Sequence, residues 1–499
     1  MLSRREAVVL TLLFIASLPA VTTRLYSSDE VEYFAYLRSL WFDRDVSFEN
    51  EYQYFYDHRI AQSADFHRTF LELETATGRR INYGTMGCAI LWSPFYALAD
   101  ATTRAGRGWG WGRDIPADGY SRPYISAVAY GSAFYGFAAV VLSIRAARRV
   151  VGPGAFSSAM AVWLGTPLLF YMYVAPPFSH ACSAFAVALF VTMWLYARET
   201  WSVRRATALG LAGALMAMVR EQDLFFALGP ALDVALTVVS EKRLPPPRGA
   251  GEKRRGSAPP AESEEGPGSA MAVRSRLDVM TAAVAGISAF AIGYLPQLLA
   301  YRALNGKFGP SPLVTRKMSW SAPHALQVLA DPQHGFFFWT PLAVLAVAGL
   351  LVLALVGPKA HATDGTDAPR IGALMLLMLG LQVYISGAVE SWTVAGAFGQ
   401  RRFVAVTILL VVGLAALRAA LRTRLLRAGV NVAIALCMWW NVALMAEFGT
   451  SMMDRQRLEL RRNLYDAFVT LPRAAPDLAY RYFTRRSSFY RPSSTEEPR

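Results

Sequence analysis

The first candidates for chemistry are two adjacent acids, Asp29 and Glu30, which follow an N-terminal apolar run. A carboxylate at the lip of a membrane cavity can act as a general base toward a hydroxyl, because low dielectric raises its pKa. Ser27 and Glu30 also fit the S-x-x-E capping box, and acids in a first helical turn favour the helix dipole. The sequence leaves both catalysis and capping open for these acids. We expect Asp29 to be the catalytic carboxylate and Glu30 to be its helper or a cap.

Further polar side chains recur at the ends of later apolar stretches, where an ionisable residue is functional or paired. The candidates for substrate binding are Tyr83, His180, Arg220, Glu221, His334, Gln400, Arg401 and Arg402. Each has a structural alternative. Arg220 and Glu221 could form an ion pair, the two histidines could be hydrogen-bonded interface residues, and the two later arginines could simply snorkel at the membrane surface.

Other motifs point away from nucleotide and disulfide chemistry. Asp43, Arg44 and Asp45 form a D-x-D triplet, which in soluble sugar-nucleotide enzymes can hold a metal and a diphosphate. No Gly-rich phosphate loop accompanies it, so we interpret the triplet as structural and expect no nucleotide. The three cysteines have no paired spacing and are expected to be packing residues.

The composition places the chain in a membrane. Of its 499 residues, 54% are hydrophobic and only 17% are charged, too apolar for an ordinary soluble protein. The net charge of +14 comes from short basic runs between apolar stretches, as in loops that face an anionic leaflet. Nucleic-acid binding is therefore not expected, and membrane lipids are the expected surroundings.

Apolar stretches long enough to span a bilayer predict an all-α polytopic membrane protein with about 11 to 12 transmembrane helices. Eleven stretches lie at residues 6–23, 123–143, 154–173, 180–197, 206–221, 223–240, 279–301, 335–356, 371–389, 403–417 and 428–447. A twelfth, from Gly84 to Ala101, contains Pro94 and is expected to be a re-entrant or surface helix.

The distribution of Lys and Arg predicts the orientation. The loops at 145–153, 198–205, 241–276, 357–370 and 418–427 hold 20 of these residues, whereas the intervening loops hold 7. The first set is therefore expected inside and the second outside, which is the periplasm in a bacterium. Against this arrangement, the segment after Glu447 would lie outside while it carries ten Arg.

Four regions follow from these patterns: an N-terminal membrane module at 1–240, a linker at 241–276, a C-terminal membrane module at 277–448 and a basic tail at 449–499. The linker has almost no large apolar residue and is expected to be disordered and cytoplasmic. The N-terminal module contains an acid-bearing external loop at 24–83. The loop should open with an amphipathic helix whose Val31, Phe34, Leu37 and Trp41 lie on the membrane surface.

The motifs, taken in order, resemble the membrane-embedded glycosyltransferases of the C-type fold, which include protein O-mannosyltransferases and the lipid A aminoarabinose transferase. The segments are SDEVEY at 28–33, NYGTMGCAILWSPFYALA at 82–99, GTPLLFYMYVAPPFSHA at 165–181, HGFFFWTP at 334–341 and AFGQRRF at 397–403. Related proteins often carry a Pro-rich turn before the second hydrophobic segment. Here that turn has no proline, so the chain departs from the family pattern at Tyr83.

The resemblance implies an inverting enzyme of the cell envelope that uses a polyprenyl-phosphate sugar as donor at the periplasmic face of the inner membrane. Asp29 would serve as base, and Arg220, Arg401 or Arg402 would stabilise the phosphate. The acceptor could be a lipid, a glycan or a protein. No cofactor is certain, and a divalent metal is possible. A transporter or flippase of lipid-linked sugars and a noncatalytic membrane scaffold remain as alternatives.

Overall fold

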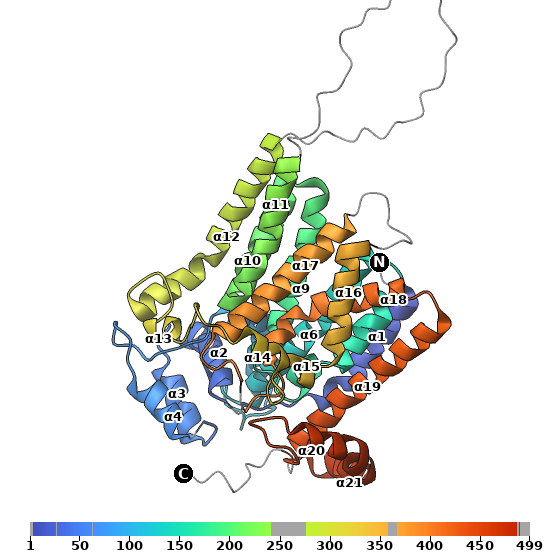
Figure 1. Cartoon of the computed structure of the whole chain (residues 1–499). Coiled ribbons are helices and arrows are strands. Elements are labelled where there is room, and N and C mark those ends of the chain that lie inside the picture. Colours follow the sequence, from blue (N-terminus) through green and yellow to red (C-terminus); the bar gives the residue numbers. More distant parts are fainter. Residues whose placement is uncertain are drawn as a thin grey trace, which may run out of the picture.

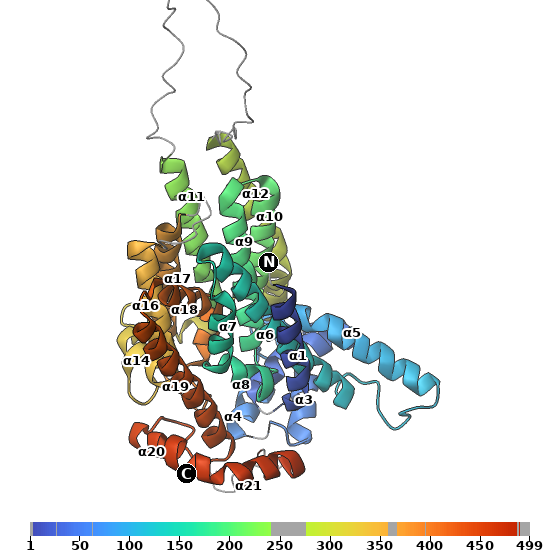
Figure 2. The same ribbon diagram turned by 90° about the vertical axis from the view of Figure 1, so that its right-hand side faces the viewer.

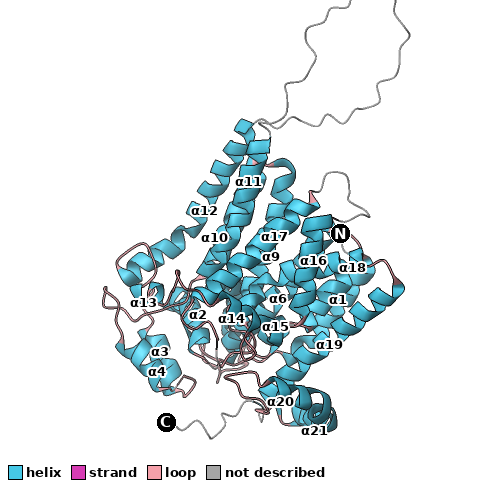
Figure 3. Ribbon diagram, in the orientation of Figure 1, coloured by secondary structure: helices cyan, strands magenta, loops and turns pink. Residues whose placement is uncertain are grey.

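The computed structural model describes residues 3–25, 27–61, 63–240, 276–357, 367–394, 396–486 and 489. Apart from two isolated β-bridges, the regular structure in these ranges is helical (Figure 3). The helices are α1 (Arg4–Ser17), α2 (Ser28–Arg38), α3 (Glu49–Asp57), α4 (Ala64–Phe66), α5 (Gly87–Gly108), α6 (Arg122–Val150), α7 (Ala155–Leu164), α8 (Leu168–Tyr173), α9 (His180–Thr200), α10 (Val203–Val219), α11 (Leu228–Ser240), α12 (Arg276–Asn305), α13 (Pro312–Thr315), α14 (Ala325–Ala330), α15 (Phe336–Trp339), α16 (Leu342–Val356), α17 (Ala368–Ala388), α18 (Thr407–Ala420), α19 (Arg424–Gly449), α20 (Leu460–Tyr465) and α21 (Leu471–Thr484). Short 3₁₀ segments, η4 (Glu221–Ala227) and η6 (Arg401–Val406), lead into α11 and α18.

Seven helical segments in the described ranges are long and apolar enough to cross a membrane. They are Arg122–Val150, His180–Thr200, Glu221–Val239, Leu277–Asn305, Ala368–Ala388, Arg401–Ala420 and Arg424–Gly449. The protein is therefore an all-α polytopic membrane protein, as expected.

The remaining four of the eleven predicted stretches form shorter helices. Gly165–Pro167 separates α7 from α8, and Thr340–Pro341 separates α15 from α16. Pro19 lies just beyond the end of α1. Proline has no N–H to continue a helix. These apolar runs are therefore divided into two helices, although their hydropathy is continuous. The fourth, at 206–221, ends with α10 at Val219.

The N-terminal and C-terminal modules pack directly against each other. Helix α10 lies along α12, and α6 lies along α18 (Figures 1 and 2). Gly210 of α10 faces the backbone of Gly286 so closely that a Cβ atom would not fit. Within the C-terminal module, Gly349 of α16 meets Gly413 of α18 in the same way. Small residues allow such close helix crossings in membranes, so the two modules form one helical body.

Helix α2 forms where the sequence predicted it, with the expected capping box between Ser27 and Glu30. Its location differs from the prediction. Val31, Phe34 and Leu37 are buried inside the protein, against α5 and neighbouring aromatic rings, rather than on a membrane surface. The sequence pattern shows an apolar face but not what covers it, and here protein covers it. The covered face fixes the direction in which the acids of α2 point.

Helix α5 contains Pro94 and is not among the seven candidate spans. It extends sideways from the helical body in Figure 2. This arrangement agrees with the expectation that the Gly84–Ala101 stretch is not an ordinary spanning helix.

The C-terminal tail begins with two helices that lie across the end of α19 (Figure 2). The backbone N–H of Leu458 donates to the carbonyl of Gln333 at 2.9 Å, and that of Gly396 donates to Arg455 at 3.0 Å. The tail is thus held beside the loops around 333 and 396, at the other end of the molecule from the upper ends of α11 and α12 (Figure 1). The linker predicted at 241–276 falls almost wholly outside the described residues.

Candidate functional site

A polar cavity of about 450 Å³ lies where the two modules meet. Helix α2, the starts of α9 and η4, the loop before α14, the end of α17 and the start of η6 all contribute to its wall. The charged side chains of the wall are Asp29, Glu32, Arg220, Glu221, Lys317, Arg401 and Arg402. Tyr83 and His180 also line it. Seven of the ten residues predicted from the sequence therefore come together around one space.

Asp29 and Arg401 form an ion pair across this cavity. The Oδ2 atom of Asp29 lies 2.9 Å from Nη1 of Arg401, and the two side chains are 39% and 24% exposed. Asp29 is in the first turn of α2, and Arg401 begins η6, more than 370 residues later. The Arg401 guanidinium also lies over the ring of Phe178, at 5.4 Å from its centroid. The carboxylate thus faces the cavity with one cation already beside it.

Arg220 is held by residues at the start of α9. Its Nη1 atom lies 2.7 Å from Nδ1 of His180 and 3.4 Å from Oγ of Ser179. Guanidinium groups only donate hydrogen bonds, so Nδ1 of His180 is the acceptor and the imidazole is neutral in this arrangement. The predicted alternative of an ion pair between Arg220 and Glu221 is wrong. Glu221 instead accepts hydrogen bonds from the hydroxyls of Tyr301 at 2.6 Å and Tyr294 at 3.1 Å.

Glu32 is a second acid of α2 in the wall, and the sequence analysis missed it. It follows Asp29 by three residues, so both lie on one face of the helix, and its side chain is buried. Burial, strengthened by the charge of Asp29, raises the pKa of Glu32 from 4.5 to about 8. Its Oε1 atom accepts the backbone N–H of Tyr83 at 2.9 Å. The spacing of three residues between Asp29 and Glu32 is visible in the sequence and is the signal that could have identified Glu32.

Lys317 was also missed, because it sits in a long loop with no pattern to mark it. Its ammonium group lies 4.6 Å from the centre of the Tyr83 ring. Tyr83 therefore lies in the cavity wall, although the turn before α5 has no proline. Burial and the nearby Glu32 raise the pKa of the Tyr83 hydroxyl.

Three predicted residues have other positions. Glu30 caps α2 through Ser27, whose backbone N–H lies 3.1 Å from Oε2 of Glu30, and it does not line the cavity. Gln400 donates to the backbone carbonyls of His334 at 2.7 Å and Trp392 at 3.2 Å. It therefore ties two loops together behind the wall, and neither Gln400 nor His334 lines the cavity.

Arg402 does line the cavity, but its guanidinium is anchored to the preceding loop, which follows α17. It donates to the backbone carbonyl of Ser391 at 3.0 Å and to the hydroxyl at 3.1 Å. Arg401 and Arg402 are thus different in kind: the first faces Asp29, and the second holds the loop at the end of α17.

The D-x-D triplet has the structural role we predicted. Asp43 pairs with Arg38 and accepts a hydrogen bond from Asn50 at 2.8 Å. Asp45 accepts from the Ser39 hydroxyl at 2.7 Å. Within the described ranges, no group of three or more His, Cys, Asp and Glu side chains is arranged to hold a metal ion.

The cavity can accommodate an anion beside a carboxylate. Four cationic side chains and three acidic ones line it, and the pKa of Glu32, near 8, keeps that acid mostly protonated at neutral pH. Comparison of the chain with protein-family models, with curated proteins and with solved structures gives no match.

Proposed function

We propose that this protein is a glycosyltransferase that moves a sugar from a polyprenyl-phosphate donor to a hydroxyl of a lipid, glycan or protein acceptor. The observation that carries the proposal is the Asp29–Arg401 pair in a cavity with an excess of positive charge. Such a cavity offers a base for the acceptor and cations for the donor phosphate. The order of motifs that resembles C-type glycosyltransferases supports the same reading.

The excess of cations suits the donor. Breaking the bond between the sugar and its phosphate leaves negative charge on the phosphate, and positioned cations stabilise that charge in the transition state. Arg401, Arg220 and Lys317 are the candidates, whereas both terminal nitrogens of Arg402 already donate to Ser391. An arginine can bind a phosphate through two parallel hydrogen bonds.

The Asp29–Arg401 contact suggests how donor binding would prepare the base. While Asp29 is paired with Arg401, its Oδ2 atom is occupied by the guanidinium and is not free to accept the proton of a hydroxyl. A donor phosphate that competes for the guanidinium would weaken this pair. Asp29 would then be free to take the proton of the acceptor hydroxyl.

In the proposed step, the acceptor oxygen attacks the anomeric carbon from the side opposite the phosphate. The new bond to the acceptor forms as the bond to the phosphate oxygen breaks, and the electron pair of that bond goes to the leaving phosphate. The acceptor proton goes to Asp29. A single displacement of this kind inverts the anomeric centre and needs neither a nucleotide nor a covalent enzyme intermediate.

The location we propose is a bacterial inner membrane with the cavity facing the periplasm. The charge count of the loops supports this orientation, since the loops at 302–334 and 389–402 next to the cavity carry few basic residues.

The test is transfer from radiolabelled polyprenyl-phosphate sugars by purified protein in lipid nanodiscs. We expect Asp29→Asn to fold normally and to lose roughly 100- to 10,000-fold in turnover, the usual worth of general-base assistance. The matched control is Glu30→Gln, which removes the neighbouring acid but keeps an oxygen for the capping box, and it should retain most activity. Near-normal turnover of Asp29→Asn would refute Asp29 as base.

The same preparations distinguish the alternative functions. A flippase would move the lipid-linked sugar across a liposome membrane without forming a covalent product. A scaffold would do neither. Arg401→Lys keeps the charge but removes bidentate geometry, so unchanged donor affinity in this variant would remove Arg401 from the phosphate site.

A further inference from the structure

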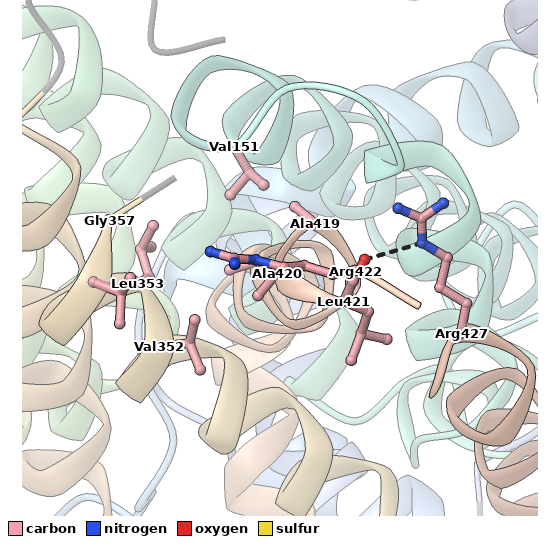
Figure 4. A pocket seen from close by; sticks show the side chains of 11 residues that line it. Val151, Val352, Leu353, Gly357, Ala419, Ala420, Leu421, Arg422 and Arg427 are labelled. Carbon is pink, nitrogen blue, oxygen red and sulfur yellow. Dashed lines mark hydrogen bonds between the residues drawn. The ribbon is translucent and has the colours of Figure 1, made fainter. Parts of the chain in front are cut away.

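Two adjoining cavities lie at the far end of the helices from the Asp29 cavity. Their volumes are about 370 and 270 Å³, and they share Ala419, Leu421 and Arg427 in their walls. The ends of α16 and α18, the start of α19 and the segment between α6 and α7 contribute to their walls, and Figure 4 shows the larger of the two cavities. They open just beyond the crossing where Gly349 meets Gly413 and holds α16 and α18 in close contact.

The charged side chains in the walls of these two cavities are all arginines: Arg418, Arg422 and Arg427. None of the three has a carboxylate partner within the described part of the chain. Arg427 donates from Nε to the carbonyl of Leu421 at 3.0 Å, which leaves its terminal nitrogens available. In Figure 4, Arg422 and Arg427 lie on the two sides of Leu421. The cavities therefore present positive charge that no described acid neutralises.

The start of α19 adds to this positive field. Thr423 caps the helix by accepting the N–H of Leu426 at 3.2 Å, and the earlier N–H groups of the first turn remain without helical partners. The N-terminal end of a helix carries partial positive charge and favours anions. Arg422 and Arg427, which lie on either side of this helix end in the chain, both line the larger cavity.

The position of the cavities along the helices places them relative to the membrane. The segment Arg401–Ala420 has the Asp29 cavity at its start and the arginine cavities at its end. A helix rises about 1.5 Å per residue, so this 20-residue segment spans roughly 30 Å, the thickness of the hydrocarbon core. The arginine cavities therefore lie at the opposite membrane face from the Asp29 cavity.

We propose that these cavities bind the phosphate of an anionic phospholipid head group. Large apolar side chains close in the chain to the lining residues Val356 and Arg427 are exposed: Leu355 at 81%, Leu425 at 83% and Leu426 at 55%. Acyl chains can cover such residues while the head group meets the arginines, whereas a free phosphate would leave them bare. Basic pockets between transmembrane helices bind anionic head groups in this manner. The site is independent of the glycosyltransferase proposal.

The test is lipid retention by the full chain, measured by native mass spectrometry after purification from nanodiscs that contain equal amounts of phosphatidylglycerol and phosphatidylcholine. We expect the wild type to retain phosphatidylglycerol preferentially. An arginine near an anionic surface is worth about fivefold in affinity, so Arg422→Gln with Arg427→Gln should reduce the preference by about 25-fold. Arg424→Gln removes one charge from an exposed neighbour outside both cavities, as each single variant does within them, and it should change the preference little.

Two results would overturn the proposal. The first is an equal loss of preference in Arg424→Gln and the double variant, which would indicate a general charge effect. The second is protection of the wild type against thermal unfolding by inorganic phosphate as strong as that by phosphatidylglycerol, which would identify a site for soluble phosphate. If the double variant does not fold, Arg422→Gln and Arg427→Gln taken singly give the same comparison, each with an expected loss of about fivefold.

Discussion

Changing Glu32 to glutamine should make the protein more stable at neutral and alkaline pH. Glu32 is 5% exposed, and burial raises its pKa from 4.5 to about 8. Glutamine has the shape of the protonated acid and keeps an oxygen for the backbone N–H of Tyr83, which lies 2.9 Å from Glu32. The change therefore removes the cost of charging a buried acid and leaves its main contact in place.

The sign and size of the change in stability follow from the protons that the folded and unfolded states bind. The unfolded chain releases the Glu32 proton near pH 4.5, whereas the folded protein keeps it until about pH 8. The folded state binds more protons in this window, so its stability falls as the pH rises from 4.5 to 8. The difference between the two pKa values corresponds to at most about 5 kcal/mol. With an unfolding entropy of about 1 kcal/mol/K for a chain of this length, this is at most about 5 °C in Tm.

The assay is thermal unfolding of wild type and Glu32→Gln in the same nanodiscs between pH 5 and pH 9. The two Tm values should be close at pH 5 and should separate as the pH rises, with the variant higher. Asp65→Asn serves as the control, because the Asp65 side chain is 86% exposed and its removal should leave the pH profile unchanged. Parallel curves for wild type and Glu32→Gln across the whole range would refute the reasoning.

The remaining predictions concern packing and topology. Gly210→Val should lower Tm by about 1–3 °C, because the crossing with Gly286 has no room for a side chain and overpacking costs about 1–3 kcal/mol; an unchanged Tm would mean that α10 and α12 are not in contact. Asp233→Asn should cost about 3 kcal/mol, measured by thermal unfolding, because the buried carboxylate pairs with Arg198 at 3.0 Å and Arg370 at 2.7 Å; an equally stable variant would contradict this. Reporter fusions after Arg254 should be active only as cytoplasmic reporters, and fusions within 391–400 only as external ones. The reverse pattern would overturn the charge-based orientation.

Hydropathy determines the class of this protein, since seven helices that could span a membrane follow from long apolar runs. The capping box of α2 is equally local: a serine and a glutamate three residues apart specify it. The structural role of the D-x-D triplet was also predicted from the sequence. These features depend on residues close together in the chain, which is why sequence reasoning reaches them.

The composition of the cavity depends on contacts between distant residues. The sequence supplied Asp29 and Arg401 separately, but only the packing of α2 beside the start of η6 places them 2.9 Å apart. The same packing directs Glu32 into the wall and Glu30 into a cap, although both acids lie in the first turns of one helix. Burial on every side of α2 decides between these outcomes. A pattern along the chain can predict that a helix has two faces, but only tertiary structure decides what each face meets.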